Sequence, residues 1–218
     1  MNIGIIGTGM VGEALATKLV QLGHAVKMGA RSATNEKAAA WVKNASGNAK
    51  GASHGTFAEA ASFGEVVLNC TSGAVSLEAL QAAGPEALRG KILIDVANPL
   101  GAPDHGLPIL GLAGKDSLGE QIQRAFPETR VVKTLNTINV DVMVNPRAIA
   151  GGDHALFLCG NDAAAKASVR ELLATFGWKE FIDLGDITAA RGTESYLPLW
   201  LRLMKSLGTA AFNIKVVR

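Results

Sequence analysis

The sequence has few cysteines and lacks a long hydrophobic run. Only two cysteines, Cys70 and Cys159, occur among 218 residues. They stand far apart, which excludes a disulfide framework and favours a reducing cytoplasm with both thiols free. The longest stretches without Asp, Glu, Lys or Arg, residues 1–12 and 66–77, hold twelve residues each, whereas a transmembrane helix needs about 20. We therefore expect a soluble cytoplasmic protein that has no membrane partner.

An excess of charge of one sign is also lacking. The 21 basic and 19 acidic residues leave a net charge of +2, and no block of like charges occurs, so no nucleic-acid partner is expected. Residues 1–4 lack the basic segment of a signal peptide, so we expect no secretory leader. The four histidines are scattered without metal-ligand spacing, and no metal site is predicted. We interpret His24 as structural, and His105 and His154 as surface residues.

Glycine and hydrophobic residues, in contrast, are abundant. Glycine occurs 25 times, and 48% hydrophobic against 18% charged residues predict a globular protein with a substantial core. Short apolar runs alternate with segments of helical period, which predicts an α/β fold with a doubly wound parallel sheet. The expected strands are 2–6, 25–28, 66–69, 92–96 and 131–134, and the expected helices are 10–22, one starting at 37–42, 76–83 and one from the cap Ser117 to Phe126.

The pattern changes after Asn145-Pro146, which predicts a small C-terminal α+β extension. We place one domain at 1–148 and a C-terminal substrate and dimerisation domain at 149–218. Its expected elements are strands at 155–159, 181–184 and 212–217 and helices from 162 or 163 to 176 and at 193–207.

Two segments of this chain predict features beyond the sheet. The expected helix 193–207 is apolar around much of its circumference, which is typical of a core or of a homodimer interface and less often of one wall of a substrate cleft. We expect a homodimer. Residues 101–114 are rich in glycine and proline and are predicted to form a loop, either a mobile loop beside the site or an ordinary surface connection.

The first strand ends in a glycine-rich turn. Gly7-Thr8-Gly9-Met10-Val11-Gly12 has the pattern G-x-G-x-x-G, directly follows a strand and directly opens a helix, which predicts dinucleotide binding by a Rossmann domain at 1–148. Gly7 permits the tight turn, Gly9 lets the backbone approach a pyrophosphate, and Gly12 lets the helix pack on the strand. Free N–H groups at the start of the helix attract the negative charge.

The end of the second strand selects the dinucleotide. An Asp or Glu there would accept hydrogen bonds from a free ribose 2′-OH, but the chain reads Gly29-Ala30-Arg31-Ser32. Arg31 can bond a phosphate through two N–H groups, Ser32 can donate a hydrogen bond, and Lys37 adds a positive charge. NADP(H) is therefore predicted in preference to NAD(H).

Two further strands end at the same edge of the expected sheet, where ligands of such folds bind. The strand 66–69 is followed by Cys70-Thr71-Ser72-Gly73, and the strand 92–96 by Ala97-Asn98-Pro99. Small residues let a cofactor lie against the backbone, and Asn98 can bond a carboxamide or a ribose hydroxyl. The candidate cofactor contacts at these two strand ends are Cys70, Thr71, Ser72, Ala97, Asn98 and Pro99.

With these motifs, the chain resembles the NADP-dependent oxidoreductases of the coenzyme F420 type, and its N-terminal half is similar to the cytosolic reductase domain of the STEAP metalloreductases. The resemblance covers nearly all residues. In the C-terminal part it rests on Phe157–Asp162, Asp183–Asp186, Arg191, Glu194-Ser195, Leu197-Pro198-Leu199 and Phe212–Lys215.

The resemblance implies roles for single residues. Residues 8–11 would contact the pyrophosphate, Arg31 and Lys37 the 2′-phosphate, and the surroundings of Thr71, Val75 and Ala97 the nicotinamide half of the cofactor.

This chain departs from the F420-using members in three places. Those members have a longer glycine turn, a serine in place of Ala30, and a His followed three residues later by Pro where this chain has Asn136 and Asn139. Because that strand end lies against the second substrate, Asn136 is a candidate substrate contact, and the acceptor is left open.

No catalytic acid or base is predicted. Hydride transfer between a nicotinamide and a flavin-like ring needs two rings held with their reacting atoms about 3–3.5 Å apart in a site that excludes water. We therefore predict an NADPH-dependent oxidoreductase whose small-molecule acceptor is the deazaflavin F420, a flavin or a comparable compound such as a quinone. Two alternatives stay open: an NADP(H)-sensing binding module without turnover, and an F420-independent flavin or ferric reductase.

Overall fold

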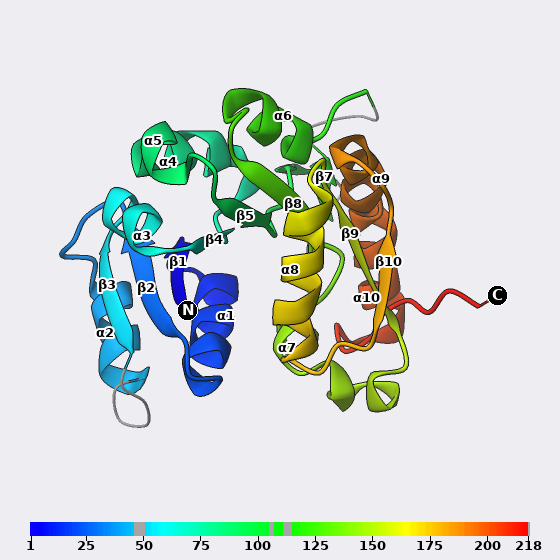
Figure 1. Cartoon of the computed structure of the whole chain (residues 1–218). Helices are drawn as coiled ribbons and strands as arrows, with labels where there is room; N and C mark the ends of the chain where they lie inside the picture. The colour runs from blue at the N-terminus through cyan, green and yellow to red at the C-terminus, as the bar shows by residue number, and fades with distance from the viewer. Residues whose placement is uncertain (46–50, 105–106, 111–114, 218) are drawn as a thin grey trace.

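A single eight-stranded sheet runs through the molecule. The computed structural model describes residues 1–217 except 46–50, 105–106 and 111–114, and Figure 1 shows the sheet with helices on both faces. The strand order is β10-β9-β8-β5-β4-β1-β2-β3. The bounds are β1 Asn2–Ile6, β2 Ala25–Ala30, β3 Ala52–Thr56, β4 Val66–Asn69, β5 Ile92–Asp95, β8 Arg130–Thr134, β9 Ala155–Cys159 and β10 Glu180–Asp183.

The helices divide between the two faces because alternate strand residues point to opposite sides. In β1, Ile3 and Ile5 belong to a buried cluster with α1, α2, α7 and α8, whereas Ile6 belongs to a second cluster with α3, α4, α5 and α6. The bounds are α1 Met10–Gln21, α2 Glu36–Ala45, α3 Phe57–Phe63, α4 Ser76–Ala83, α5 Pro85–Leu88, α6 Leu118–Ala125, α7 Val140–Val144 and α8 Ala163–Ala174. The predicted α/β fold of doubly wound type is confirmed.

One strand breaks the parallel order. β9 runs antiparallel to β8, with Lys133 opposite Cys159 and Thr134 opposite Leu158, whereas the other described pairs of this sheet are parallel. The sheet is therefore mostly parallel, and β9 and β10 continue it.

Several expectations need correction. β3 and α3 were not predicted, because β3 reads Ala-Ser-His-Gly-Thr and has no apolar run. The expected loop 101–114 contains, in its described part, an antiparallel hairpin of β6 Leu100–Asp104 and β7 Leu107–Leu110. The expected helix 193–207 is divided at Tyr196 into α9 Ala190–Ser195 and α10 Leu197–Leu207.

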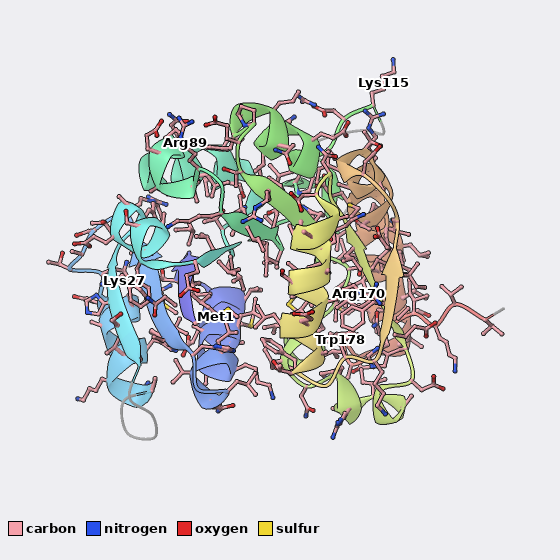
Figure 2. The ribbon with its side chains drawn as sticks, in the orientation of Figure 1. Met1, Lys27, Arg89, Lys115, Arg170 and Trp178 are labelled. Carbon is pink, nitrogen blue, oxygen red and sulfur yellow. The ribbon has the colours of Figure 1, made fainter. Side chains whose placement is uncertain are left out.

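The expected C-terminal strand and the exposure of His154 were both wrong. Residues 212–217 form no strand; Ala155 donates a backbone hydrogen bond to the Ile214 carbonyl oxygen at 2.9 Å. His154 is 2% exposed. Its Nδ1 accepts from the Asn213 amide at 2.8 Å and its Nε2 lies 2.8 Å from the Pro146 carbonyl oxygen. Trp178, labelled in Figure 2, packs edge-on against it. His105 lies outside the described residues.

No helix in the described part of the chain is long and apolar enough to span a membrane. Among the same residues, no group of three or more His, Cys, Asp and Glu side chains could hold a metal ion.

Two glycine substitutions test this packing. A Cβ at Gly4 in β1 would collide with the Ala60 carbonyl oxygen of α3, whereas a Cβ at Gly192 in α9 meets no atom within 4 Å. We expect Gly4→Ala to lower the free energy of unfolding by about 1–3 kcal/mol. Gly192→Ala should leave it unchanged or raise it by up to about 1 kcal/mol, because alanine favours helix. Urea unfolding of both variants measures the difference, and equal values would contradict the packing of α3 on β1.

Candidate functional site

A cleft of about 620 Å³ lies where β1, β2 and β4 end at their carboxyl edge. Parallel strands of this fold present their ligand-binding loops at that edge. Three segments that lie far apart in the sequence meet there. Of the predicted site residues, the cleft is lined by Gly7, Thr8, Gly9, Ala30, Arg31, Ser32, Cys70, Thr71, Ser72 and Val75.

The glycine turn has the geometry that its spacing predicts. Gly7 has a φ of +117°, and a Cβ there would lie 2.8 Å from the Cys70 carbonyl oxygen. A Cβ at Gly12 would lie 2.5 Å from the Gly7 carbonyl oxygen. Both positions therefore require glycine.

Gly9 differs from the other two glycines of the turn. No atom lies within 4 Å of the position of its Cβ, so the space above it is open. It is the N-cap of α1, and no side chain caps this helix end. Backbone N–H groups at the start of α1 are therefore available to an anion.

The end of β2 carries exposed polar groups. Ser32 and Thr34 join through their hydroxyl oxygens at 2.8 Å, and the Thr34 N–H donates to Ser32 Oγ at 3.2 Å. Asn35 accepts from the Ala38 N–H at 3.0 Å at the start of α2. The exposed Arg31 side chain lies at the rim of the cleft, where it can reach a phosphate.

Not all predicted residues line this cleft. Lys37 and Met10 line a neighbouring groove between α1 and α2, and Val11 packs against the core. The loop after β5 lies beside the cleft, since a Cβ at Gly73 would collide with the Asn98 carbonyl oxygen. Ala97, Asn98 and Pro99 therefore border the cleft without being among its lining residues.

Asn98 and Asn136 form a reciprocal pair. The Asn98 amide donates to the Asn136 carbonyl oxygen at 2.7 Å, and the Asn136 amide donates to Asn98 Oδ1 at 3.0 Å. Asn136 is 4% exposed, and the preceding Leu135 has a φ of +64°, a conformation that costs about 1–3 kcal/mol in a residue other than glycine. The structure thus places the Asn136 side chain against the loop after β5.

A buried ammonium group that was not predicted from the sequence lies between the strands. Lys133 in β8 is 0% exposed. Its Nζ lies 2.8 Å from Asp95 Oδ2 and 2.8 Å from Glu194 Oε1, and it donates to the Ala97 carbonyl oxygen. A lysine within an apolar strand was the one available signal, because such a residue needs buried acceptors.

The charge of Lys133 is stabilised by its partners. Burial lowers the pKa of the ammonium, but the Asp95 and Glu194 carboxylates outweigh burial and raise this pKa above its usual value. A pKa raised in the folded state makes a contribution to stability that is complete below the unfolded value of about 10.4. That contribution is lost only as the pH rises through the folded value.

A small apolar cavity lies beyond β8. Its volume is about 190 Å³. The Tyr196 hydroxyl is buried without a hydrogen-bond partner among the described residues, and burial raises the pKa of Tyr196. Thr137 connects the cavity to the Asn98–Asn136 pair. The lining residues are Thr137, Phe157, Leu184, Gly192, Thr193, Tyr196 and Ile214.

Neither cysteine has the properties of a nucleophile. Burial raises the pKa of the Cys70 thiol, with Asp95 adding to the rise, and burial raises the pKa of Cys159 to about 12. Both thiols are therefore protonated at neutral pH, although Cys70 lines the cleft.

Comparisons with known proteins decide the family. Residues 2–99 match the model of a family described as NADP oxidoreductase coenzyme F420-dependent. The crystal structure of a putative F420-dependent NADP-reductase from Arthrobacter sp. FB24 is 49% identical, covers 99% of both chains and superposes with a TM-score of 0.93. The chain belongs to this family.

Two curated relatives are more distant. Metalloreductase STEAP3 of Rattus norvegicus is 30% identical over 210 residues, which are 91% of this chain and 38% of the relative. The F420-dependent NADP reductase of Methanocaldococcus jannaschii is 30% identical over 131 residues, 57% of this chain and 56% of the relative. The chain thus spans less than two thirds of the length of each.

Removal of the buried ammonium tests the Lys133 assignment. We expect Lys133→Met to lower the free energy of unfolding by about 3–5 kcal/mol, because it leaves two buried carboxylates without a counter-charge. The matched control is Lys166→Met. Lys166 pairs with Asp183 at 2.8 Å, but the Asp183 side chain is 40% exposed, so its loss should cost at most about 1 kcal/mol. Denaturant unfolding of both variants decides, and a Lys133→Met cost no greater than the control would refute the assignment.

Proposed function

We propose that this protein is an NADPH-dependent oxidoreductase that transfers hydride between NADP(H) and a flat acceptor such as the deazaflavin F420 or a flavin. The observation that carries the proposal is the cleft, where an uncapped helix start and the Arg31-Ser32 rim meet at one strand edge. No carboxylate stands at the end of β2, where NAD-binding proteins have one.

The residues of the cleft fit NADP(H). The open space above Gly9 takes a pyrophosphate against the backbone. Arg31 and Ser32 hold the 2′-phosphate by charge-assisted hydrogen bonds, and Lys37 adds a positive charge from the adjoining groove. Thr71, Val75 and the loop of Ala97 and Asn98 border the nicotinamide half. When bound, NADPH supplies the hydride from its nicotinamide ring.

The acceptor is assigned to the apolar cavity beyond β8. Phe157, Leu184 and Ile214 give this cavity an apolar lining. The neutral Tyr196 hydroxyl provides a hydrogen bond to a ring oxygen or nitrogen. Residues 1–148 would then bind the cofactor, and residues 149–218 would supply most of the acceptor wall.

Two proposals concern the state of the protein. A reducing cytoplasm suits the two free thiols. A homodimer through α10 is supported by Leu199 and Leu207, which are 56% and 57% exposed on this helix. Analytical ultracentrifugation tests the dimer, and a monomer at micromolar concentration would overturn it.

The acceptor can be identified by following the loss of NADPH absorbance with F420, FMN, FAD, a quinone and a ferric chelate. We expect turnover with F420 or a flavin. Turnover with the ferric chelate alone would favour a ferric reductase, and the STEAP3 relative is named a metalloreductase. NADPH binding without oxidation by any acceptor would contradict the proposed function and favour a binding module that senses NADP(H).

The 2′-phosphate assignment is tested at Arg31. We expect Arg31→Ala to weaken NADPH binding by about 1–3 kcal/mol, the cost of a lost hydrogen bond to a charged group, and to leave NADH binding nearly unchanged. Calorimetric titration with both nucleotides measures the difference. Arg89→Ala is the control, since Arg89 is not among the lining residues of the cleft and pairs with Glu86. Figure 2 labels Arg89. An equal loss for NADPH and NADH would refute the assignment.

A further inference from the structure

A chain of hydrogen bonds, most of them buried, runs from the cofactor cleft to Glu194 in α9, whose neighbour Thr193 lines the apolar cavity. Its centre is Lys133, which contacts Asp95 at the end of β5 and Glu194 in α9. All three are buried, with exposed fractions of 5% or less, so water does not compete for their hydrogen bonds.

One arm of the chain reaches the cofactor side. Asp95 Oδ1 accepts from the Asn69 amide at 2.8 Å and from the Ala97 N–H at 3.2 Å. Asn69 Oδ1 accepts in turn from the Thr71 hydroxyl at 2.7 Å, and Thr71 lines the cleft. The loops after β4 and β5 are therefore both held by the Asp95 carboxylate.

The other arm reaches the acceptor side. Glu194 Oε2 accepts from the Leu118 N–H at 2.8 Å, and Oε1 accepts from the Gly119 N–H at 3.1 Å, both at the start of α6. Thr193, which precedes Glu194, and Tyr196, which follows α9, line the apolar cavity. The position of this cavity wall is thus set through the Glu194 carboxylate.

The charges along this hydrogen-bond chain are balanced by other protein groups and not by water. Lys133 supplies one positive charge against two carboxylates, and the positive end of the α6 dipole offsets the remaining negative charge. Apolar residues of similar volume could fill this space without the cost of desolvating three charges, so packing alone does not account for the charged groups. Hydrogen bonds, unlike apolar contacts, fix both the distance and the direction between the groups that they join.

We propose that Lys133, Asp95 and Glu194 are positioning residues for hydride transfer, an inference that rests on the proposed function. They hold the loops of Thr71 and Ala97 and the wall of Thr193 and Tyr196 at a fixed separation. The nicotinamide and the acceptor ring then meet at the transfer distance. A misplacement of about 1 Å in such a site can lower the rate by about 100-fold.

The test compares two buried glutamates that both join α6 and α9. Glu194→Gln removes a charge from the hydrogen-bond chain. Glu120→Gln instead removes the ion pair between Glu120 and Arg191, and this pair has no connection to β5. Glu120 is 5% exposed and Glu194 is 3% exposed. The two variants therefore have the same substitution, similar burial and a connection between the same two helices.

The readout is single-turnover hydride transfer from NADPH and from NADPH deuterated at the transferred position, with the acceptor that wild type uses. For Glu194→Gln we expect a rate at least about ten-fold lower, a larger deuterium isotope effect and an NADPH dissociation constant within about two-fold of wild type. Glu120→Gln should keep the wild-type rate and isotope effect, whatever it does to stability.

Four results would decide against one of the two proposals. Equal rates in Glu194→Gln and wild type, or equal losses in both variants, would overturn the positioning role. If Glu194→Gln does not fold, Glu194→Asp keeps the charge and shortens the side chain by one methylene. That variant should also slow transfer and raise the isotope effect, and a wild-type rate would overturn the proposal. Failure of wild type to oxidise NADPH with any acceptor would instead overturn the proposed function.

Discussion

The arrangement of strands, loops and helices at the carboxyl edge of this sheet depends on one buried ammonium group. Lys133 has no access to water, so its three N–H donors must find protein acceptors. It finds them in β5, in the loop that follows β5 and in α9. The approach of the C-terminal helices to the nucleotide-binding strands is therefore limited by hydrogen-bond geometry as well as by apolar burial. β9 runs antiparallel beside β8, with Cys159 opposite Lys133, and brings the C-terminal segment to the same edge.

The features that were predictable from the sequence are local ones. β1, the glycine turn and α1 occupy one continuous stretch, so their apolar periods and glycine spacing are visible in neighbouring residues of the sequence. The residues of β4 and α4 were predicted at their observed bounds for the same reason. β3 carries no apolar run and gains its order by pairing with β2, which is a tertiary effect. The division between α9 and α10 follows from Pro198, which cannot donate a backbone hydrogen bond within the helix.

The parts of the site that sequence reasoning missed depend on contacts between distant segments. Asp95, Lys133 and Glu194 occupy three elements, and none shows by its neighbours that it will be buried with the others. His154 was misread for a similar reason, since its partners Pro146 and Asn213 come from loops without periodicity. The candidate cofactor cleft, in contrast, includes the glycine turn, so glycine spacing predicts this part of its shape even though the spacing does not show which side chains border it.

Two nearby residues at the end of β8 have different structural effects. Lys133 ties the strand to β5 and α9, and two residues later Leu135 adopts a positive φ that redirects the chain. The turn brings Asn136 to Asn98, and their two hydrogen bonds offset the conformational cost. The histidine that the resemblance to F420-using members implies at this position would be a titratable group. Here the position carries an amide that is already bonded to the cofactor-side loop. In the proposed reaction an acceptor therefore meets an uncharged edge, and its selection falls to the shape and apolar lining of the adjoining cavity.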